Sequence, residues 1–219
     1  MQKFIISAFI VAVVAGDCTL KCPDGYLSFK RTPTAQNSMT SLWCVKTIFP
    51  GQTVNLTTAK ALCEKDGSVL TTFENDGERL QLSSALQDGL SAMKISLGQM
   101  FVDGHRIPQC ITQDRTILRA APCLDPTTAF TTDDKHTDNT FMLQNWADTE
   151  PSASFWQQDV ESCVVLGISQ FEKRNKKLND VLCDFDKSPV NTNAQDLWNV
   201  GVVLTPGTSI IGFFVPIQF

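Results

Sequence analysis

The stretch WADTEPSASFWQQDVESCVVLGISQFEKRNKKLNDVLC, residues 146–183, contains the features that decide the fold. It holds the triplet Glu150-Pro151-Ser152, then Glu161 two residues before Cys163, and finally Leu178-Asn179-Asp180 shortly before Cys183. Carboxylate, amide and hydroxyl oxygens thus recur close to cysteines in this stretch.

Elsewhere in the chain, strand and helix patterns alternate, which predicts an α+β domain. Apolar patterns of strand length occupy residues 42–49, 69–73, 95–102, 141–146, 163–168 and 177–183. Amphipathic helices are predicted at 57–66 and 74–90. About forty residues rich in Thr, Asp, Pro and Cys follow the strand at 95–102, and such a long aperiodic segment is usually functional or pinned. For the basic run 173–177 we favour a solvated hairpin tip over a polyanion site.

The composition excludes several classes of function. The 219 residues are 42% hydrophobic and 19% charged, as in ordinary globular proteins, and the net charge of −5 argues against a nucleic-acid binder. His105 and His136 are the only histidines, so a multi-histidine metal site is excluded, and we assign neither a role. No HExxH, GxSxG or phosphate-binding loop occurs, and only Glu150 and Glu161 suggest hydrolase carboxylates. We therefore expect that the protein is not an enzyme.

The amino terminus predicts the compartment. Residues 1–16 combine Lys3, an apolar run and the small residues Ala15 and Gly16, which is the layout of a secretory signal peptide. A secreted, extracellular protein would keep its eight cysteines in disulfides, although spacing alone leaves 105 pairings open. The sequon at Asn55 is then a candidate glycosylation site.

The motifs around Trp146, the Glu150 triplet, Glu161, Leu178-Asn179-Asp180 and Cys183, in this order, resemble the C-type lectin-like domain. The resemblance spans residues 22–186. The insertion that carries Cys110 and Cys123 is similar to that of secreted nematode members of the family. It implies a C-type lectin-like fold with two helices, small antiparallel sheets and a long irregular loop region. The domain is expected at residues 17–190, including an amino-terminal hairpin at 18–50.

The resemblance also implies how the cysteines pair. Three disulfides are expected: Cys22 with Cys44, Cys110 with Cys123, and Cys163 with Cys183. Cys63 would pair in the family with a final cysteine that this chain lacks. Cys18 and Cys63 are left over, and they pair with each other, form intermolecular bridges or stay free.

By the same resemblance, five residues hold Ca²⁺ and four of them also contact carbohydrate. The calcium ligands are Glu150, Ser152, Glu161, Asn179 and Asp180, and the carbohydrate contacts are Glu150, Ser152, Glu161 and Asn179. In the family, a cis bond before the motif proline turns both flanking side chains toward the ion. Two positions depart from the motif. Ser152 replaces an amide or carboxylate, and Leu178 replaces a tryptophan, so the site is degenerate. We favour core packing for Trp146 over a role as a sugar-stacking platform.

The carboxyl-terminal segment 191–219 departs from the family pattern, because it has no charged residue after Asp196. We favour an aberrant final strand, with residues 210–215 in the position of the missing cysteine-bearing strand. A lipid-anchor signal is the next alternative and would be the only source of membrane association. A transmembrane helix is disfavoured by Pro206 and Pro216.

Two functions follow from the resemblance. The first is calcium-dependent binding of microbial or host glycans, in innate defence. The second is a lectin-like module that binds protein or lipid without calcium and without sugar, because a fold does not fix a function.

Overall fold

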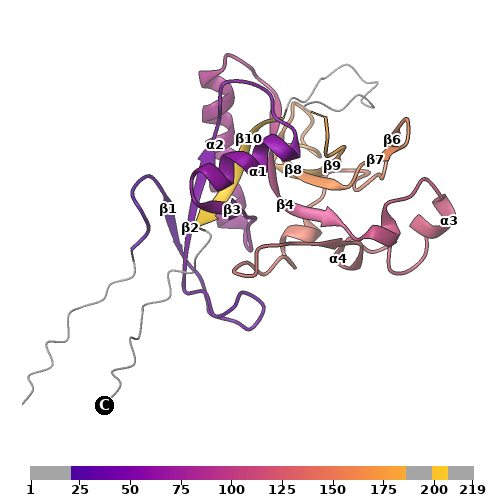
Figure 1. The fold of residues 1–219 in the computed structure, drawn as a ribbon, viewed down its shortest axis with the longest axis horizontal. Helices are drawn as coiled ribbons and strands as arrows, with labels where there is room; N and C mark the ends of the chain where they lie inside the picture. Colours follow the sequence, from indigo (N-terminus) through magenta and orange to yellow (C-terminus); the bar gives the residue numbers. More distant parts are fainter. Residues whose placement is uncertain (1–20, 186–198, 207–219) are drawn as a thin grey trace, which may run out of the picture.

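The computed structural model describes residues 21–185 and 199–206 as one α+β unit (Figure 1). The strands are β1 (Leu27–Lys30), β2 (Leu42–Ile48), β3 (Ser68–Leu70), β4 (Gly98–Arg106), β5 (Phe130–Thr131), β6 (Phe155–Trp156), β7 (Asp159–Val160), β8 (Cys163–Ile168), β9 (Lys177–Val181) and β10 (Asn199–Pro206). The helices are α1 (Leu56–Lys65), α2 (Asp76–Ala92), α3 (Arg115–Leu118) and α4 (Pro126–Ala129), with 3-10 turns at Pro108–Cys110 and Met142–Gln144. None of the helices in the described ranges has the length and apolar character needed to cross a membrane.

One eight-stranded sheet organises the molecule. Its main path runs β1-β2-β10-β4-β8-β9, with β3 paired to β10 and β5 paired to β4, while β6 and β7 form a separate hairpin. Every pair is antiparallel except β10 with β4, which is parallel. The last strand of the described residues, β10, therefore lies in the middle of the sheet.

The two long helices cover opposite faces of this sheet. Met100 and Val102 of β4 belong to the same buried cluster as the α2 leucines, whereas Phe101 belongs to the cluster around α1, because strand side chains alternate between faces. In α2, Leu82, Leu86 and Leu90 repeat every four residues and are at most 2% exposed. The helix-period pattern in the sequence thus becomes one packed layer of the core.

Most predicted elements are confirmed. The helices predicted at 57–66 and 74–90 are α1 and α2, the strand predicted at 163–168 is β8, and the basic run forms the turn between β8 and β9. The two predicted helices are confirmed, and in addition Asp114 and Asp125 cap the single-turn helices α3 and α4 within the long aperiodic segment. Helices of one turn are too short to show a hydrophobic period.

Two strand predictions need correction or qualification. Residues 141–146 form no strand; they contain a 3-10 turn, and only Trp146 makes an isolated bridge, to Leu178. The apolar side chains there fill the core, which explains the misleading pattern. The predicted strand 210–215 lies outside the described residues, as do residues 1–16. The strand β10 lies after residue 190, in the segment 191–219.

The three expected disulfides are confirmed: Cys22–Cys44, Cys110–Cys123 and Cys163–Cys183. The last of these joins β8 to the segment that follows β9. Cys63 is buried and has a free thiol, and burial raises its pKa to about 12. Cys18 lies outside the described residues.

Candidate functional site

Four of the five predicted calcium ligands lie together beside the Glu150–Pro151 bond, which is cis. Asp180 comes from β9, Glu161 directly follows β7, and Glu150 and Ser152 come from the loop that leads to β6. We call Glu150, Ser152, Glu161 and Asp180 the acidic site.

Asp180 anchors the loop of the acidic site and is completely buried. One of its carboxylate oxygens accepts a hydrogen bond from the amide N–H of Ser152 at 2.9 Å, and the other accepts one from that of Ala153 at 3.0 Å. Arg106 of β4 adds a 2.7 Å ion pair to the second oxygen. Both oxygens of Asp180 are therefore engaged by groups of the protein.

Arg106 is the residue of this site that the sequence did not reveal. Its guanidinium also donates to the carbonyl oxygen of Glu161 at 3.0 Å and lies 4.6 Å from the centre of the Phe130 ring. The side chain is 2% exposed, so its charge acts in a region from which water is largely excluded. Arg106 and Asp180 are 74 residues apart in the chain, and no local motif signals their pairing.

Ser152 and Glu161 form the second half of the acidic site. The Ser152 hydroxyl donates to Glu161 Oε2 at 2.9 Å, and the amide N–H of Ser154 lies 3.2 Å from the same oxygen. The Ser152 and Ser154 hydroxyls are 2.9 Å apart. Serine at the degenerate motif position therefore contacts a carboxylate of the site directly.

Glu150 has the least favourable surroundings of the three carboxylates. Its Oε2 is buried and has no hydrogen-bond partner in the described part of the chain, while its Oε1 lies 3.4 Å from a guanidinium nitrogen of Arg174. Burial, followed by the nearby charges of Asp180 and Glu161, raises the pKa of Glu150 to about 8. The free carboxyl thus holds a proton at neutral pH, which a bound cation would displace.

Asn179 is not brought into these contacts. It precedes Asp180 in β9 and lies opposite Val165 of β8, and adjacent strand residues point to opposite faces of a sheet. Over residues 21–185 and 199–206, the Asn179 side chain makes no hydrogen bond to the acidic site.

A second group of potential metal ligands lies where β4 meets the segment after β5. Donor atoms of Asp103, His105 and Asp133 lie within 4.8 Å of one another. Burial is the main cause that raises the pKa of Asp103 to about 7, and the charges of Asp133 and Asp134 add to it. An imidazole in this group suits transition metals better than Ca²⁺, so the acidic site is the better candidate for calcium.

The described surface beside the acidic site carries two large aromatic side chains. Phe155 and Trp156, in the β6–β7 hairpin, are each 43% exposed. The segment with α3 packs beside them, since Gln113 donates to the carbonyl oxygen of Gln157 at 3.2 Å and Arg115 to that of Ser152 at 2.9 Å. Both segments project from the same side of the sheet (Figure 1).

Trp146 and Leu178 contribute to the core below the site. The Trp146 ring lies 4.8 Å from that of Phe130, and Leu178 is fully buried. Leucine at the motif tryptophan position therefore keeps an apolar anchor next to Asn179 and Asp180.

Comparisons with known proteins agree on one family. The family described as C-type lectin domain-containing protein 141/158 matches residues 28–204. C-type lectin domain-containing protein 158 of Caenorhabditis elegans is 58% identical over 203 residues, which are 93% of this chain and 96% of that protein. C-type lectin domain-containing protein 141 of the same organism is 36% identical over 197 residues, 83% of this chain and 64% of that protein. Among solved structures, human lithostathine aligns with a TM-score of 0.49 at 13% identity, covering 89% of this chain and 96% of that one.

Proposed function

Because the chain belongs to the C-type lectin domain family, we propose that it is a secreted protein that binds carbohydrate through calcium at the acidic site. Glu150 and Glu161 would supply charged ligands, and the Ser152 hydroxyl a neutral one. Asp180 would position the loop rather than contact the ion, because Arg106 and two amide N–H groups already occupy it. Bound calcium would also accept two adjacent sugar hydroxyls as ligands.

The observation that carries this proposal is the Oε2 atom of Glu150. It is a buried carboxylate oxygen without a partner in the described residues, and two further carboxylates raise the pKa of its group. A buried polar atom without a partner is costly, and a divalent cation would satisfy it and offset the repulsion. Once a cation displaces the proton of Glu150, the three carboxylates carry one negative charge more than Arg106 and the more distant Arg174 offset.

The proposal describes a binding protein rather than an enzyme, since the acidic site needs no proton transfer to hold a sugar by coordination. The signal-peptide pattern of residues 1–16 and the three disulfides support secretion, and the Asn55 sequon would then carry a glycan. Microbial or host glycans are the partners that we propose, with innate defence as the role that microbial glycans would imply.

One observation favours the second candidate function, a lectin-like module that binds protein or lipid without calcium. Arg106 already provides a cation for Asp180, and the exposed rings of Phe155 and Trp156 beside the site offer apolar contact area. In that case the charge of the acidic site would be balanced within the protein.

Binding to immobilised glycans in calcium and in EDTA separates these two functions. The wild-type protein should bind more strongly in millimolar Ca²⁺ than in EDTA, and Glu161→Gln should bind weakly in both. Glu172→Gln, which changes an exposed glutamate outside the site, is the matched control and should behave as the wild type. Absence of glycan binding in both buffers would favour the second candidate.

A further inference from the structure

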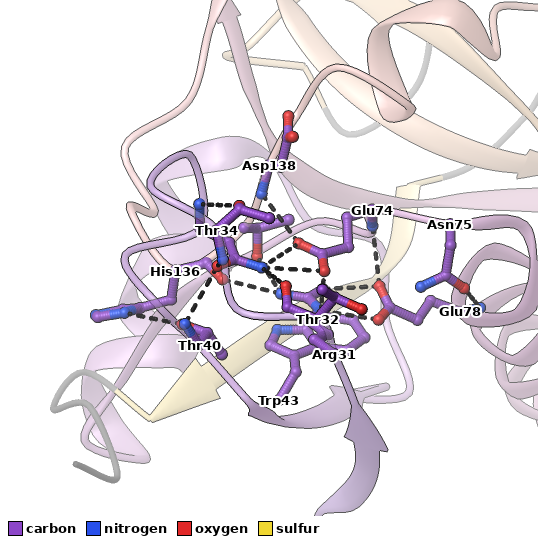
Figure 2. Close-up of polar contacts among 12 residues, drawn as sticks. Arg31, Thr32, Thr34, Thr40, Trp43, Glu74, Asn75, Glu78, His136 and Asp138 are labelled. Atoms are coloured by element: carbon purple, nitrogen blue, oxygen red, sulfur yellow. Dashed lines mark hydrogen bonds and ion pairs between the residues drawn. The ribbon is translucent and has the colours of Figure 1, made fainter.

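A cavity of about 480 Å³ lies between three segments that are far apart in the sequence. It is surrounded by the loop after β1, by the residues just before α2, and by the segment that leads into the 3-10 turn at Met142–Gln144 (Figure 2). It shares no lining residue with the acidic site. Its volume falls in the range of small-molecule sites in proteins.

Arg31 fixes the floor of this cavity. Its side chain is fully buried, and its guanidinium lies 4.0 Å from the centre of the Trp43 ring. Two parallel hydrogen bonds of 2.8 and 2.7 Å join it to Glu78, and a third nitrogen contact reaches the Thr137 hydroxyl at 3.0 Å. The charge of Arg31 is paired with Glu78, and its N–H groups are bound to neighbouring oxygens (Figure 2). These contacts hold the Arg31 side chain in place at the floor of the cavity.

Glu74 is the group at this floor that has capacity for another partner. Its side chain is 13% exposed, and its contacts are long: 3.3 and 3.4 Å to the Asn37 amide, 3.2 Å to the amide N–H of Asp138, and 3.4 Å to Arg31. The neighbouring Glu78 accepts at 2.7 to 2.9 Å instead. Burial, the largest cause, raises the pKa of Glu74. A carboxylate held by long contacts retains lone pairs for a donor from a ligand.

The walls of the cavity are rich in uncharged hydrogen-bonding groups. Thr32, Thr34, Thr140 and Gln144 offer hydroxyls and an amide, and the partly buried ring of Phe141 adds an apolar surface. Exposed Lys30 opposes the charge of Asp138, so neither strong positive nor strong negative charge dominates. This lining fits a neutral ligand with several hydroxyl groups better than a phosphate or a metal ion.

We propose that this cavity is a second carbohydrate site, in which Glu74 and the surrounding hydroxyl and amide groups hold a neutral sugar unit without calcium. The ring of Phe141 would contact the apolar face of the sugar, while sugar hydroxyls donate to Glu74. This site is independent of the acidic site, and calcium has no part in it.

The test is a titration in EDTA, where the acidic site is silent. The probes are the methyl glycosides of glucose, galactose, mannose and N-acetylglucosamine, and binding is followed by ligand-observed NMR. The wild-type protein should bind at least one of them saturably, with a Kd of roughly 1 mM, as expected for a small ligand held by hydrogen bonds. Glu74→Gln, which keeps the shape of the side chain, should weaken this binding by about tenfold.

Two further variants keep the test decisive. Thr140→Trp changes an exposed position of the lining and should block the cavity without disturbing the buried network, whereas Glu172→Gln, an exposed position outside both sites, should leave the binding in EDTA unchanged. Thermal melting of each variant shows that it is folded. If none of the four glycosides binds up to 50 mM (roughly fifty times the expected Kd), or if Glu74→Gln and Thr140→Trp bind as tightly as the wild type, the second site does not exist. Loss of calcium-dependent binding alone would instead count against the acidic site.

Discussion

Asp180 and Glu150 belong to one site, yet their surroundings assign them different roles. Asp180 receives a buried arginine and two amide N–H groups, so its negative charge is satisfied within the protein. Glu150 faces two other carboxylates and has one oxygen without a partner among the described residues. The first residue holds the loop in place, and the second is the group that gains most from a cation.

The wild-type protein should lose stability as the pH rises, and Glu150→Gln should make this loss smaller. The folded protein holds the Glu150 proton up to about pH 8, whereas the unfolded chain releases it near the ordinary pKa of 4.5. The unfolded chain therefore binds fewer protons between these values, and the free energy of unfolding falls as pH rises from 4.5 to 8. In EDTA, the difference in Tm between pH 5 and pH 8.5 should be smaller in the variant than in the wild type. Equal differences would contradict the raised pKa, and the exposed Glu172→Gln should match the wild type.

Arg106→Met should destabilise the fold strongly, because Asp180 would keep a buried charge without its partner. Breaking a buried ion pair from one side costs about 3–5 kcal/mol, which urea unfolding at pH 7 measures. Lys173→Met is the control: its ion pair with Asp148 is 3.5 Å long and largely exposed. That surface pair should contribute no more than about 1 kcal/mol. Similar losses for the two variants would show that Arg106 is not essential to the site.

At the scale of single elements, the residue before α1, Asn55, both caps the helix and is a predicted glycosylation site. Asn55 is the N-cap of this helix: its side-chain oxygen accepts a hydrogen bond from the amide N–H of Thr58 at 2.9 Å. Its side-chain nitrogen lies 3.4 Å from the carbonyl oxygen of Asp184 and is the atom to which a glycan would be attached. The capping oxygen and the glycosylation nitrogen are thus different atoms.

The two roles of Asn55 can be separated by substitution. Asn55→Asp keeps a capping oxygen and Asn55→Ala removes it, while both destroy the sequon. In protein freed of glycans, Asn55→Ala should lose about 1 kcal/mol of unfolding free energy relative to Asn55→Asp. Mass spectrometry of the secreted wild type tests the glycan itself. Equal stability of the two variants would mean that the cap contributes nothing measurable.

The elements that the sequence predicts well are those with a clear hydrophobic period and standard caps. α1 and α2 have both, and β8 is a short apolar run with β-branched residues. Residues 141–146 have the same apolar character but form a turn, because burial in the core requires no strand. β10 was not predicted, since Asn199–Pro206 reads as part of a long uncharged tail, and only pairing with β2, β3 and β4 gives it a strand conformation.

At the scale of the whole molecule, β10 connects the two halves of the sheet. Val202, Val203 and Leu204 are fully buried, and the strand contacts β2 on one side and β4 on the other. Leu204→Ala should therefore cost about 2–5 kcal/mol in urea unfolding. Leu80→Ala is the matched control, because Leu80 is 42% exposed on α2. A loss no larger than that of the control would show that the sheet does not depend on β10.

The family match confirms the resemblance to the C-type lectin-like domain. The structure confirms the three disulfides that the resemblance implied and that spacing alone left undetermined. The motif also identified the residues that form the acidic site. It could not identify Arg106, which reaches Asp180 across 74 residues, or the cavity around Glu74, whose lining comes from three separate segments. Both depend on the path of the chain between the motifs, which the motifs do not specify.

Calcium titration followed by thermal melting tests the central claim most directly. With a Kd of roughly 0.1–1 mM, as in extracellular calcium modules, 5 mM Ca²⁺ should stabilise the wild type by about 1–2 kcal/mol, or ~3–8 °C in Tm. Glu150→Gln should lose this shift and Glu172→Gln should keep it. An unchanged wild-type Tm in 5 mM Ca²⁺, or an equal shift in Glu150→Gln, would contradict a calcium site at Glu150.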